Sequence, residues 1–186
     1  MVLFQAQMQH SAETVKRFTH LQYDTFEWWR KLLFFCLSTA LILFGVFYGS
    51  ASGFSVLTVF CIFAGSILFT NLNTRANMVA DQVIEAMHGT YPVLQYSFSE
   101  SGFTDGEDRP TVSYTKLFRL IFDEEYLYLF ASKASGYMIR KESITGEDGV
   151  RGLMDLISRE SGLTWQKPFS FLTFSIKDLH SLIRRR

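Results

Sequence analysis

The dominant pattern along this chain is one long apolar stretch, Leu32 to Thr74, which contains no Asp, Glu, Lys, Arg or His. Small and polar residues, Gly49 to Gly53, divide the stretch into two halves of similar length. At about 1.5 Å per helical residue, each half with its uncharged neighbours approaches the roughly 30 Å hydrocarbon thickness of a bilayer. The pattern predicts a transmembrane helical hairpin over residues 31–74, with helices over about 32–49 and 54–72.

Positive charges flank this hairpin on both sides and are absent from its central loop: Lys16, Arg17, Arg30, Lys31 and Arg75. Because basic residues favour the cytoplasmic side, we expect both termini in the cytoplasm and a multi-pass protein of the bacterial plasma (inner) membrane. Trp28 and Trp29, directly before Arg30 and Lys31, are the expected interfacial anchors. The alternative is a pair of core helices in a soluble bundle, although such helices usually carry a polar edge.

Residues 1–30 predict a strand followed by an amphipathic helix. Val2 to Gln9 alternates between apolar and polar positions, as expected of an edge strand with one buried face. Ser11 is placed to cap a helix whose apolar residues recur every three or four positions as far as Trp29. We expect this helix to continue into the first membrane helix. Its apolar face either packs on the cytosolic domain, which we favour, or lies along the bilayer surface.

After the hairpin, residues 75–90 predict a helical stalk that ends at Gly89, and from Tyr91 the apolar period changes to two. The predicted strands are Val93–Ser99, Thr111–Phe122, Glu125–Ala131 and Gly136–Arg140. A helix capped by Thr145 and stopped by Gly162 then closes the domain, residues 91–165. The fold class is thus an α+β membrane protein: a two-helix hairpin plus a cytosolic antiparallel β meander closed by a helix, in the manner of a pleckstrin-homology (PH)-like domain. A basic tail, residues 166–186, follows.

The order of these elements resembles the YcxB-like family of bacterial membrane proteins. The segments that carry the resemblance are Tyr96–Phe103, Ser113–Phe122, Tyr126–Phe130 and Tyr137–Ile144. Tyr114 and Arg140 stand where that family tends to have Trp and Pro. The resemblance implies two membrane helices and a PH-like C-terminal domain, and it implies no catalytic residue.

Composition and charge give little support to an enzyme or a nucleic-acid-binding protein. The formal net charge is zero, and the two cysteines, Cys36 and Cys61, both fall inside the hairpin, where they act as small apolar side chains. No nucleotide-binding, zinc-protease or nucleophile-elbow motif is present in the sequence. The sequence therefore implies no cofactor, no metal and no catalytic residue.

Two groups of polar residues have the residue types of a catalytic pair or a metal site, but we interpret both as structural. His20 and Asp24 are four apart on a helix, which favours a solvated pair because no nucleophile has a matching place. Asp105, Glu107 and Asp108 lie in one loop without the ordered ligand spacing of an EF-hand, so we interpret them as a polar turn.

Basic residues offer the better candidates for a binding surface. Four of them, Lys116, Arg119, Arg140 and Lys141, fall on or beside neighbouring predicted strands. They form either a cationic patch for lipid phosphates or, as we favour, scattered solvated charges. In the tail, Arg184, Arg185 and Arg186 follow an apolar helical period and are candidates for contact with lipid headgroups.

The leading functional hypothesis is a membrane-anchored cytosolic PH-like binding or scaffold module that recruits a protein or peptide. The alternative is a structural or accessory subunit of a larger membrane complex or transporter, because Gly45 and Gly65 with Ser66 permit close helix contact within the hairpin or with a partner. An enzyme has no positive evidence in the sequence. The bilayer is the expected partner, nucleic acid is not, and a homo-oligomer stays open.

Overall fold

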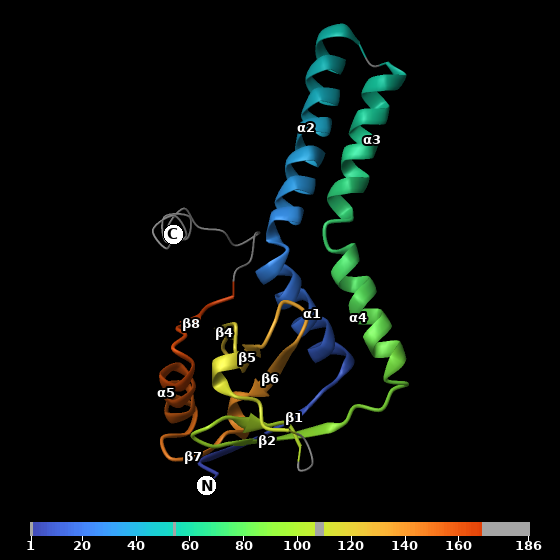
Figure 1. Ribbon diagram of the computed structural model, residues 1–186. Helices are drawn as coiled ribbons and strands as arrows, with labels where there is room; N and C mark the ends of the chain where they lie inside the picture. Colours follow the sequence, from blue (N-terminus) through green and yellow to red (C-terminus); the bar gives the residue numbers. More distant parts are fainter. Residues whose placement is uncertain (1, 54, 107–109, 169–186) are drawn as a thin grey trace. The chain divides into compact units, whose positions relative to one another are not determined.

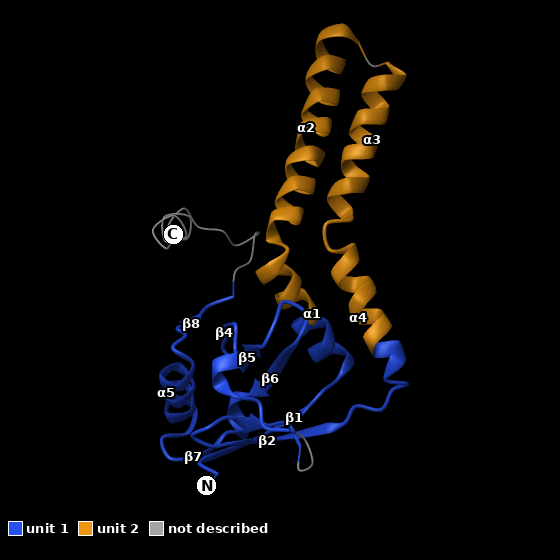
Figure 2. Cartoon of the chain, viewed as in Figure 1, with its two compact units in different colours: residues 1–18, 84–168 blue, residues 19–83, 169–186 orange. Residues whose placement is uncertain are grey.

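The computed structural model describes residues 2–53, 55–106 and 110–168. Within them the chain is a mixed α+β protein with five α-helices and two four-stranded sheets (Figure 1). The chain divides into two compact units (Figure 2). One contains Met1–Phe18 and Ile84–Pro168 and is called the β unit here. The other is built on Thr19–Val83 and is called the helical unit.

The first sheet of the β unit has the strand order β3-β2-β1-β7, with every pair antiparallel. Its strands are β1 (Phe4–Gln9), β2 (Val93–Phe98), β3 (Phe103–Thr104) and β7 (Thr145–Gly146). Burial alternates along β1, so its predicted apolar face is confirmed. Its predicted place at an edge is wrong, because β2 pairs with one side of β1 along its full length and β7 pairs with the other.

The second sheet has the order β6-β5-β4-β8 and is antiparallel except for the β4–β8 pair, which is parallel. Its strands are β4 (Arg119–Phe122), β5 (Tyr126–Phe130), β6 (Gly136–Arg140) and β8 (Trp165–Gln166). The strands were predicted to form a single meander, but they divide between two sheets, and β1 completes the first of them. Two short 3₁₀ helices, η1 (Tyr114–Lys116) and η2 (Lys141–Ser143), connect the strands.

The long strand predicted over 111–122 is interrupted by η1, and only its end forms β4. Tyr114 is fully buried, and its hydroxyl donates a 2.8 Å hydrogen bond to the backbone oxygen of Ser99. The turn buries the aromatic ring and gives its hydroxyl a hydrogen-bond partner. It is therefore favoured over a continuous strand at this point. Tyr114 is therefore a core residue, although it lies in a 3₁₀ turn and not in the predicted strand.

Aromatic side chains join the two sheets of the β unit. The ring of Tyr137 from β6 meets the ring of Phe103 from β3 edge-on, with their centroids 4.9 Å apart, and approaches Tyr96 of β2 in the same manner. All five residues of β5 are buried, so both faces of that strand are covered. Phe18 stacks on Phe130 at 5.6 Å and on Tyr128 at 6.2 Å, which covers one of these faces.

The helix α5 (Gly149–Ser161) buries Leu153, Leu156 and Ile157 and packs against η1. Its predicted stop is confirmed, since Gly162 has φ 68° and donates its amide to the oxygen of Ser158. Its predicted cap is wrong: Thr145 lies in β7, where its hydroxyl faces the backbone oxygen of Gln5 at 3.4 Å. The helix begins four residues later than that.

The remaining helices are α1 (Ala12–Phe26), α2 (Trp28–Ser52), α3 (Val56–Thr70) and α4 (Thr74–Ala86). The cap on α1 is confirmed by the 3.2 Å hydrogen bond from the amide of Thr14 to the hydroxyl of Ser11. The predicted continuity of α1 with α2 is wrong, because Glu27 takes φ −120° and ψ 18° and ends the helical path between them.

A second interruption, at residues 71–73, separates α3 from α4. The amide of the Asn71 side chain donates to the oxygen of Ile67 at 2.7 Å, while its oxygen accepts from the hydroxyl of Thr74 at 2.7 Å. The Asn71 side chain thus bonds both the last turn of α3 and the first residue of α4, which stabilises the break between the two helices. The axes of α3 and α4 are bent by 41° across it.

The helix α2 has 25 residues and is the one helix in the described part of the chain that is long and apolar enough to cross a membrane by itself. Its length is roughly 37 Å at about 1.5 Å per residue. α3 has 15 residues, and it passes the same test only together with α4. The predicted hairpin thus consists of one long helix and one shorter, bent pair.

Candidate functional site

The contact between α2 and α3 is made by small residues. Ser38, Gly45 and Gly49 are the buried positions of α2, and Thr58, Cys61 and Gly65 are those of α3. A Cβ atom on Gly45 would lie 2.9 Å from the backbone oxygen of Thr58, and one on Gly65 would lie 2.9 Å from that of Ser38. The two backbones therefore approach too closely for any residue with a side chain at these two glycines.

One hydrogen bond crosses this contact. The hydroxyl of Ser38 donates to the backbone oxygen of Gly65 at 2.7 Å, and the atoms are buried. Ser66, which the sequence grouped with Gly65, instead donates to Ile62 of its own helix. Gly45 and Gly65 are thus used by the contact within the hairpin, whereas Ser66 is exposed. Small residues spaced along both helices are the sequence signal for this contact. The hydrogen bond between Ser38 and Gly65 was not predicted from the sequence.

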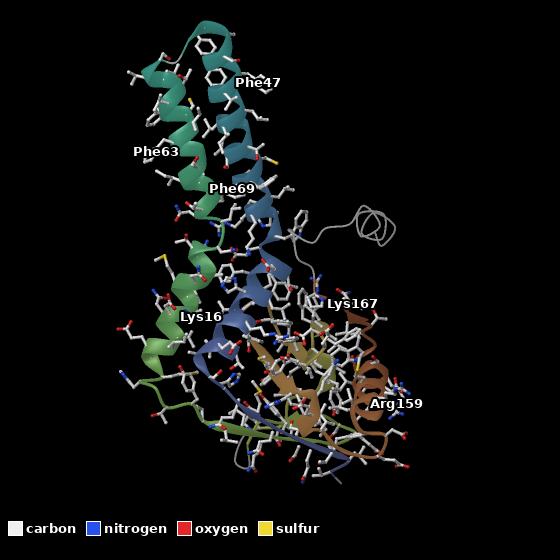
Figure 3. The ribbon with its side chains drawn as sticks, turned by 180° about the vertical axis from the view of Figure 1, so that it is seen from behind. Lys16, Phe47, Phe63, Phe69, Arg159 and Lys167 are labelled. Carbon is white, nitrogen blue, oxygen red and sulfur yellow. The ribbon has the colours of Figure 1, made fainter. Side chains whose placement is uncertain are left out.

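The outer surfaces of α2 and α3 are apolar and exposed. Phe47 on α2 is 68% exposed and Phe63 on α3 is 65% exposed, and both are labelled in Figure 3. Most of the large apolar side chains that are exposed in the described part of the chain lie on these two helices. The pair is therefore inverted relative to helices of a water-soluble core, since it buries small residues and exposes large ones.

Ionic side chains gather where both helical interruptions occur. Arg30 donates to the carboxylate of Glu27 at 3.0 Å, and Arg75 approaches the same carboxylate at 3.8 Å. Lys31 pairs with Asp24. The guanidinium of Arg30 also lies 5.9 Å from the centre of the Trp29 ring. The predicted anchors Arg30 and Lys31 thus belong to a charged cluster that includes two carboxylates.

A small cavity of about 80 Å³ opens within this cluster, and we call it the interruption pocket. The residues that line it come from both sides of the helical unit: Tyr23, Glu27, Arg30, Lys31, Phe34, Asn71, Leu72, Arg75 and Ala76. The sequence identified the positive residues by their place beside the apolar stretch. The sequence did not show that these cations converge on Glu27. The three-residue spacing of Glu27 and Arg30 is a local signal for one part of that convergence.

Trp28 and Trp29, the other two predicted anchors, are 41% and 56% exposed. They begin α2, directly before Arg30 and Lys31. Interfacial anchoring requires exposure of this kind.

The four basic residues that were candidates for a cationic patch, Lys116, Arg119, Arg140 and Lys141, are not brought together on the β unit. Arg119 lies opposite Phe130 at one end of the second sheet, whereas Arg140 lies opposite Tyr126 at the other end. Arg140 pairs with Glu142, and Lys141 donates to the backbone oxygen of Asp123. These positions favour the interpretation of scattered charges over a single cationic patch.

Lys116 and Arg119 differ in their surroundings although they are close in sequence. Lys116 is exposed at the end of η1. Arg119 is half-buried, and burial lowers the pKa of its guanidinium. The tail residues Arg184, Arg185 and Arg186 lie outside the described residues.

The β unit contains a second charged cluster, which is structural. The carboxylate of Asp123 accepts hydrogen bonds from the Tyr128 hydroxyl at 2.7 Å and from Arg17 at 3.0 Å. It also accepts from the backbone amides of Tyr126 and Glu125. Burial alone would raise the pKa of Asp123, but these donors outweigh burial and hold it below its usual range.

A larger hollow of about 530 Å³ lies on the β unit. Among the described residues that line it, amides and hydroxyls predominate and Tyr96 has the one ionisable side chain: Gln5, Ala6, Gln7, Gln95, Tyr96, Ser97, Thr104, Gly106, Ser143 and Thr145. Gln7 faces Gln95 directly across the β1–β2 ladder. The described side chains of this hollow, called the glutamine hollow here, offer hydrogen-bond donors and acceptors.

The predicted pair His20–Asp24 does not form, because His20 contacts Asn77 at 2.7 Å and Asp24 pairs with Lys31. Of the acidic loop, Asp105 is described, whereas Glu107 and Asp108 lie outside the described residues. Within the described ranges, no group of three or more His, Cys, Asp or Glu side chains is arranged to hold a metal ion.

Comparison with known proteins identifies no relative of this chain: no family model, no curated protein and no solved structure matches it.

Proposed function

We propose that the chain is a membrane-anchored binding module. In this proposal α2 and α3 insert into the bacterial plasma membrane as a hairpin, and the β unit binds its ligand in the cytoplasm. The observation that carries the proposal is the inverted packing of the two helices, with glycines inside and Phe47 and Phe63 outside. An apolar surface of this kind promotes aggregation in water, and it is well solvated by lipid chains.

The pairing of β1 with β2 supports an even number of crossings. These strands precede and follow the hairpin in sequence, and six residues of each are paired. Since paired strands must lie on one side of a bilayer, the chain between Gln9 and Val93 crosses it an even number of times. A two-pass hairpin satisfies this condition, and a single crossing by α2 does not.

We assign the binding role to the β unit. Two sheets joined through Tyr137 and followed by α5 support a PH-like fold of the kind that the YcxB-like resemblance implies. A fold of this kind does not specify a ligand. The glutamine hollow supplies uncharged donors and acceptors, which suit a polar peptide segment of a protein partner.

Single added cysteines test the membrane topology. Ala51→Cys places a thiol in the last turn of α2, and Ala134→Cys places one in an exposed loop of the β unit. A membrane-impermeant maleimide should label the first variant in intact cells and the second only after permeabilisation. The chain without an added cysteine controls for Cys36 and Cys61. Labelling of Ala134→Cys from outside, or recovery of the chain from lysate without detergent, would contradict the proposal.

Affinity purification in mild detergent separates the binding module from the subunit alternative. A stoichiometric partner that is lost after Gln7→Ala with Gln95→Ala, and kept after Phe47→Ala with Phe63→Ala, supports binding at the glutamine hollow. The reverse pattern favours a structural subunit held through its membrane helices. Purification with no partner in either case contradicts both assignments.

A further inference from the structure

The charges that line the interruption pocket do not balance. Arg30, Lys31 and Arg75 are cations, and Glu27 is the carboxylate among the lining residues. Lys31 is engaged by Asp24, which leaves two guanidinium groups on Glu27 alone. A site of this composition has an excess of positive charge and therefore attracts an anion.

The two arginines approach Glu27 in ways that leave room for a second anion. Arg30 makes a hydrogen-bonded contact with Glu27 at 3.0 Å, whereas Arg75 stands at 3.8 Å, beyond hydrogen-bond distance. The side chain of Arg75 is 59% exposed, and that of Arg30 is 40% exposed. A guanidinium has five N–H donors in a planar fork, so both arginines retain donors for another oxygen anion.

The size of the pocket restricts the anion. Its volume is about 80 Å³, whereas a water molecule takes roughly 30 Å³ of liquid. The pocket therefore admits a compact group of a few heavy atoms, such as a phosphate, while the rest of a larger molecule stays outside it. Phosphate oxygens also match the bidentate geometry of arginine.

The position of the pocket in the sequence identifies the source of the phosphate. Arg30 and Lys31 stand directly before the uncharged stretch that begins at Leu32, and Arg75 stands directly after it. In a chain that inserts this stretch into a bilayer, all three cations lie at the level of the headgroups. Trp28 and Trp29 begin the same helix, and Phe34 lines the pocket on the apolar side.

From these observations we infer that the interruption pocket binds the phosphate group of an anionic lipid through Arg30 and Arg75. This inference rests on the proposed membrane insertion. Basic pockets between membrane helices on the cytoplasmic side are a known setting for lipid headgroups. Glu27 then tunes the site, because its carboxylate competes with the phosphate for the two arginines. A bound phosphate would fix the ends of α2 and α4 on either side of the pocket.

The test uses the full chain in neutral detergent micelles, titrated with phosphatidylglycerol that carries brominated acyl chains. Quenching of Trp28 and Trp29 reports the apparent affinity, with brominated phosphatidylcholine as the zwitterionic reference. Each charge near an anionic surface changes affinity about fivefold. We expect Arg75→Gln to weaken phosphatidylglycerol binding about fivefold and Glu27→Gln to strengthen it by a similar factor. Arg159→Gln, an exposed cation on α5, serves as the matched control and should leave binding unchanged.

The opposite signs of Arg75→Gln and Glu27→Gln distinguish a binding site from a structural ion pair. If both substitutions weakened binding, or if the two lipids bound equally well, the inference would be overturned. Inorganic phosphate added to lipid-free micelles provides a further arm of the test. If it stabilised the chain as much as phosphatidylglycerol does, the inference that a lipid supplies the phosphate would be overturned. Recovery of the chain from lysate without detergent overturns the membrane proposal instead, so the two failures are distinguishable.

Discussion

Phenylalanine has opposite roles in the two units of this protein. In the β unit Phe98, Phe103 and Phe130 are fully buried, whereas in the helical unit Phe47 and Phe63 are mostly exposed. The buried positions of α2 and α3 are instead glycine, serine, threonine and cysteine. The difference teaches that the two units bury opposite kinds of side chain: the arrangement in the β unit suits water, and the arrangement in the helix pair suits lipid.

The strongest test of this comparison replaces one phenylalanine in each unit. Phe98→Ala removes a ring with no exposed surface, so we expect a loss of about 3–5 kcal/mol in the unfolding free energy of the β unit. Phe47→Ala removes a ring that touches little protein, and it should change that free energy by less than about 0.5 kcal/mol. Chemical denaturation in detergent, followed by Trp165 fluorescence in a Trp28→Phe, Trp29→Phe background, measures both. Equal losses would contradict the assigned roles.

A smaller effect is expected from the charged cluster of the β unit. Asp123→Asn removes a carboxylate that Arg17 and Tyr128 contact, and it should cost about 1.5–3 kcal/mol. Because the pKa of Asp123 is lowered in the folded chain, its contribution is complete above the ordinary value of 3.8 and is lost as the pH falls below it.

Denaturation curves across the acid range check the sign of this dependence. The unfolding free energy of the wild type should fall more steeply below about pH 4 than that of Asp123→Asn. Glu124→Gln, which changes an exposed carboxylate of the same turn, is the control for a general charge effect. An equally steep fall in Asp123→Asn would refute the assignment.

The smallest expected effect concerns the one hydrogen bond between α2 and α3. Ser38→Ala removes the bond to Gly65 and should cost about 0.6 kcal/mol, the average for such bonds in membrane helices. Ser66→Ala is the matched control, since that hydroxyl bonds within its own helix. Unfolding of the helix pair in mixed micelles of increasing dodecyl sulfate content compares the two variants. A larger loss in Ser66→Ala would show that the helices contact through another face.

Local patterns predicted the elements whose signals are contained in a few neighbouring residues. The Ser11 cap, the Gly162 stop and the strand Gly136–Arg140 are confirmed, because each depends on capping chemistry or on a period of two within one segment. The membrane hairpin was placed by its lack of charge, and its helix limits shifted to Trp28–Ser52 and Val56–Thr70. Insertion of that hairpin into a membrane stays a prediction.

Features that depend on contacts between distant residues were not predicted. The inner position of β1 requires its pairing with β2 and β7, and the separation of Arg119 from Arg140 follows from strand register. Neither is encoded in a local period. The interruption pocket was missed for the same reason, since Arg30 and Arg75 meet only through Glu27. The spacing of Glu27 and Arg30 is a local signal for their pair, but the approach of Arg75 to the same carboxylate depends on a contact between distant residues.

The strand β1 leaves the ribosome before the apolar helices, and its neighbour β2 is made only after them. The first sheet therefore cannot close until both helices have been synthesised. During that interval β1, whose apolar face carries Phe4, Ala6 and Met8, has no β2 to pair with. Biogenesis thus has a fixed order, in which both helices are synthesised before the first sheet is assembled from strands on either side of them in the sequence.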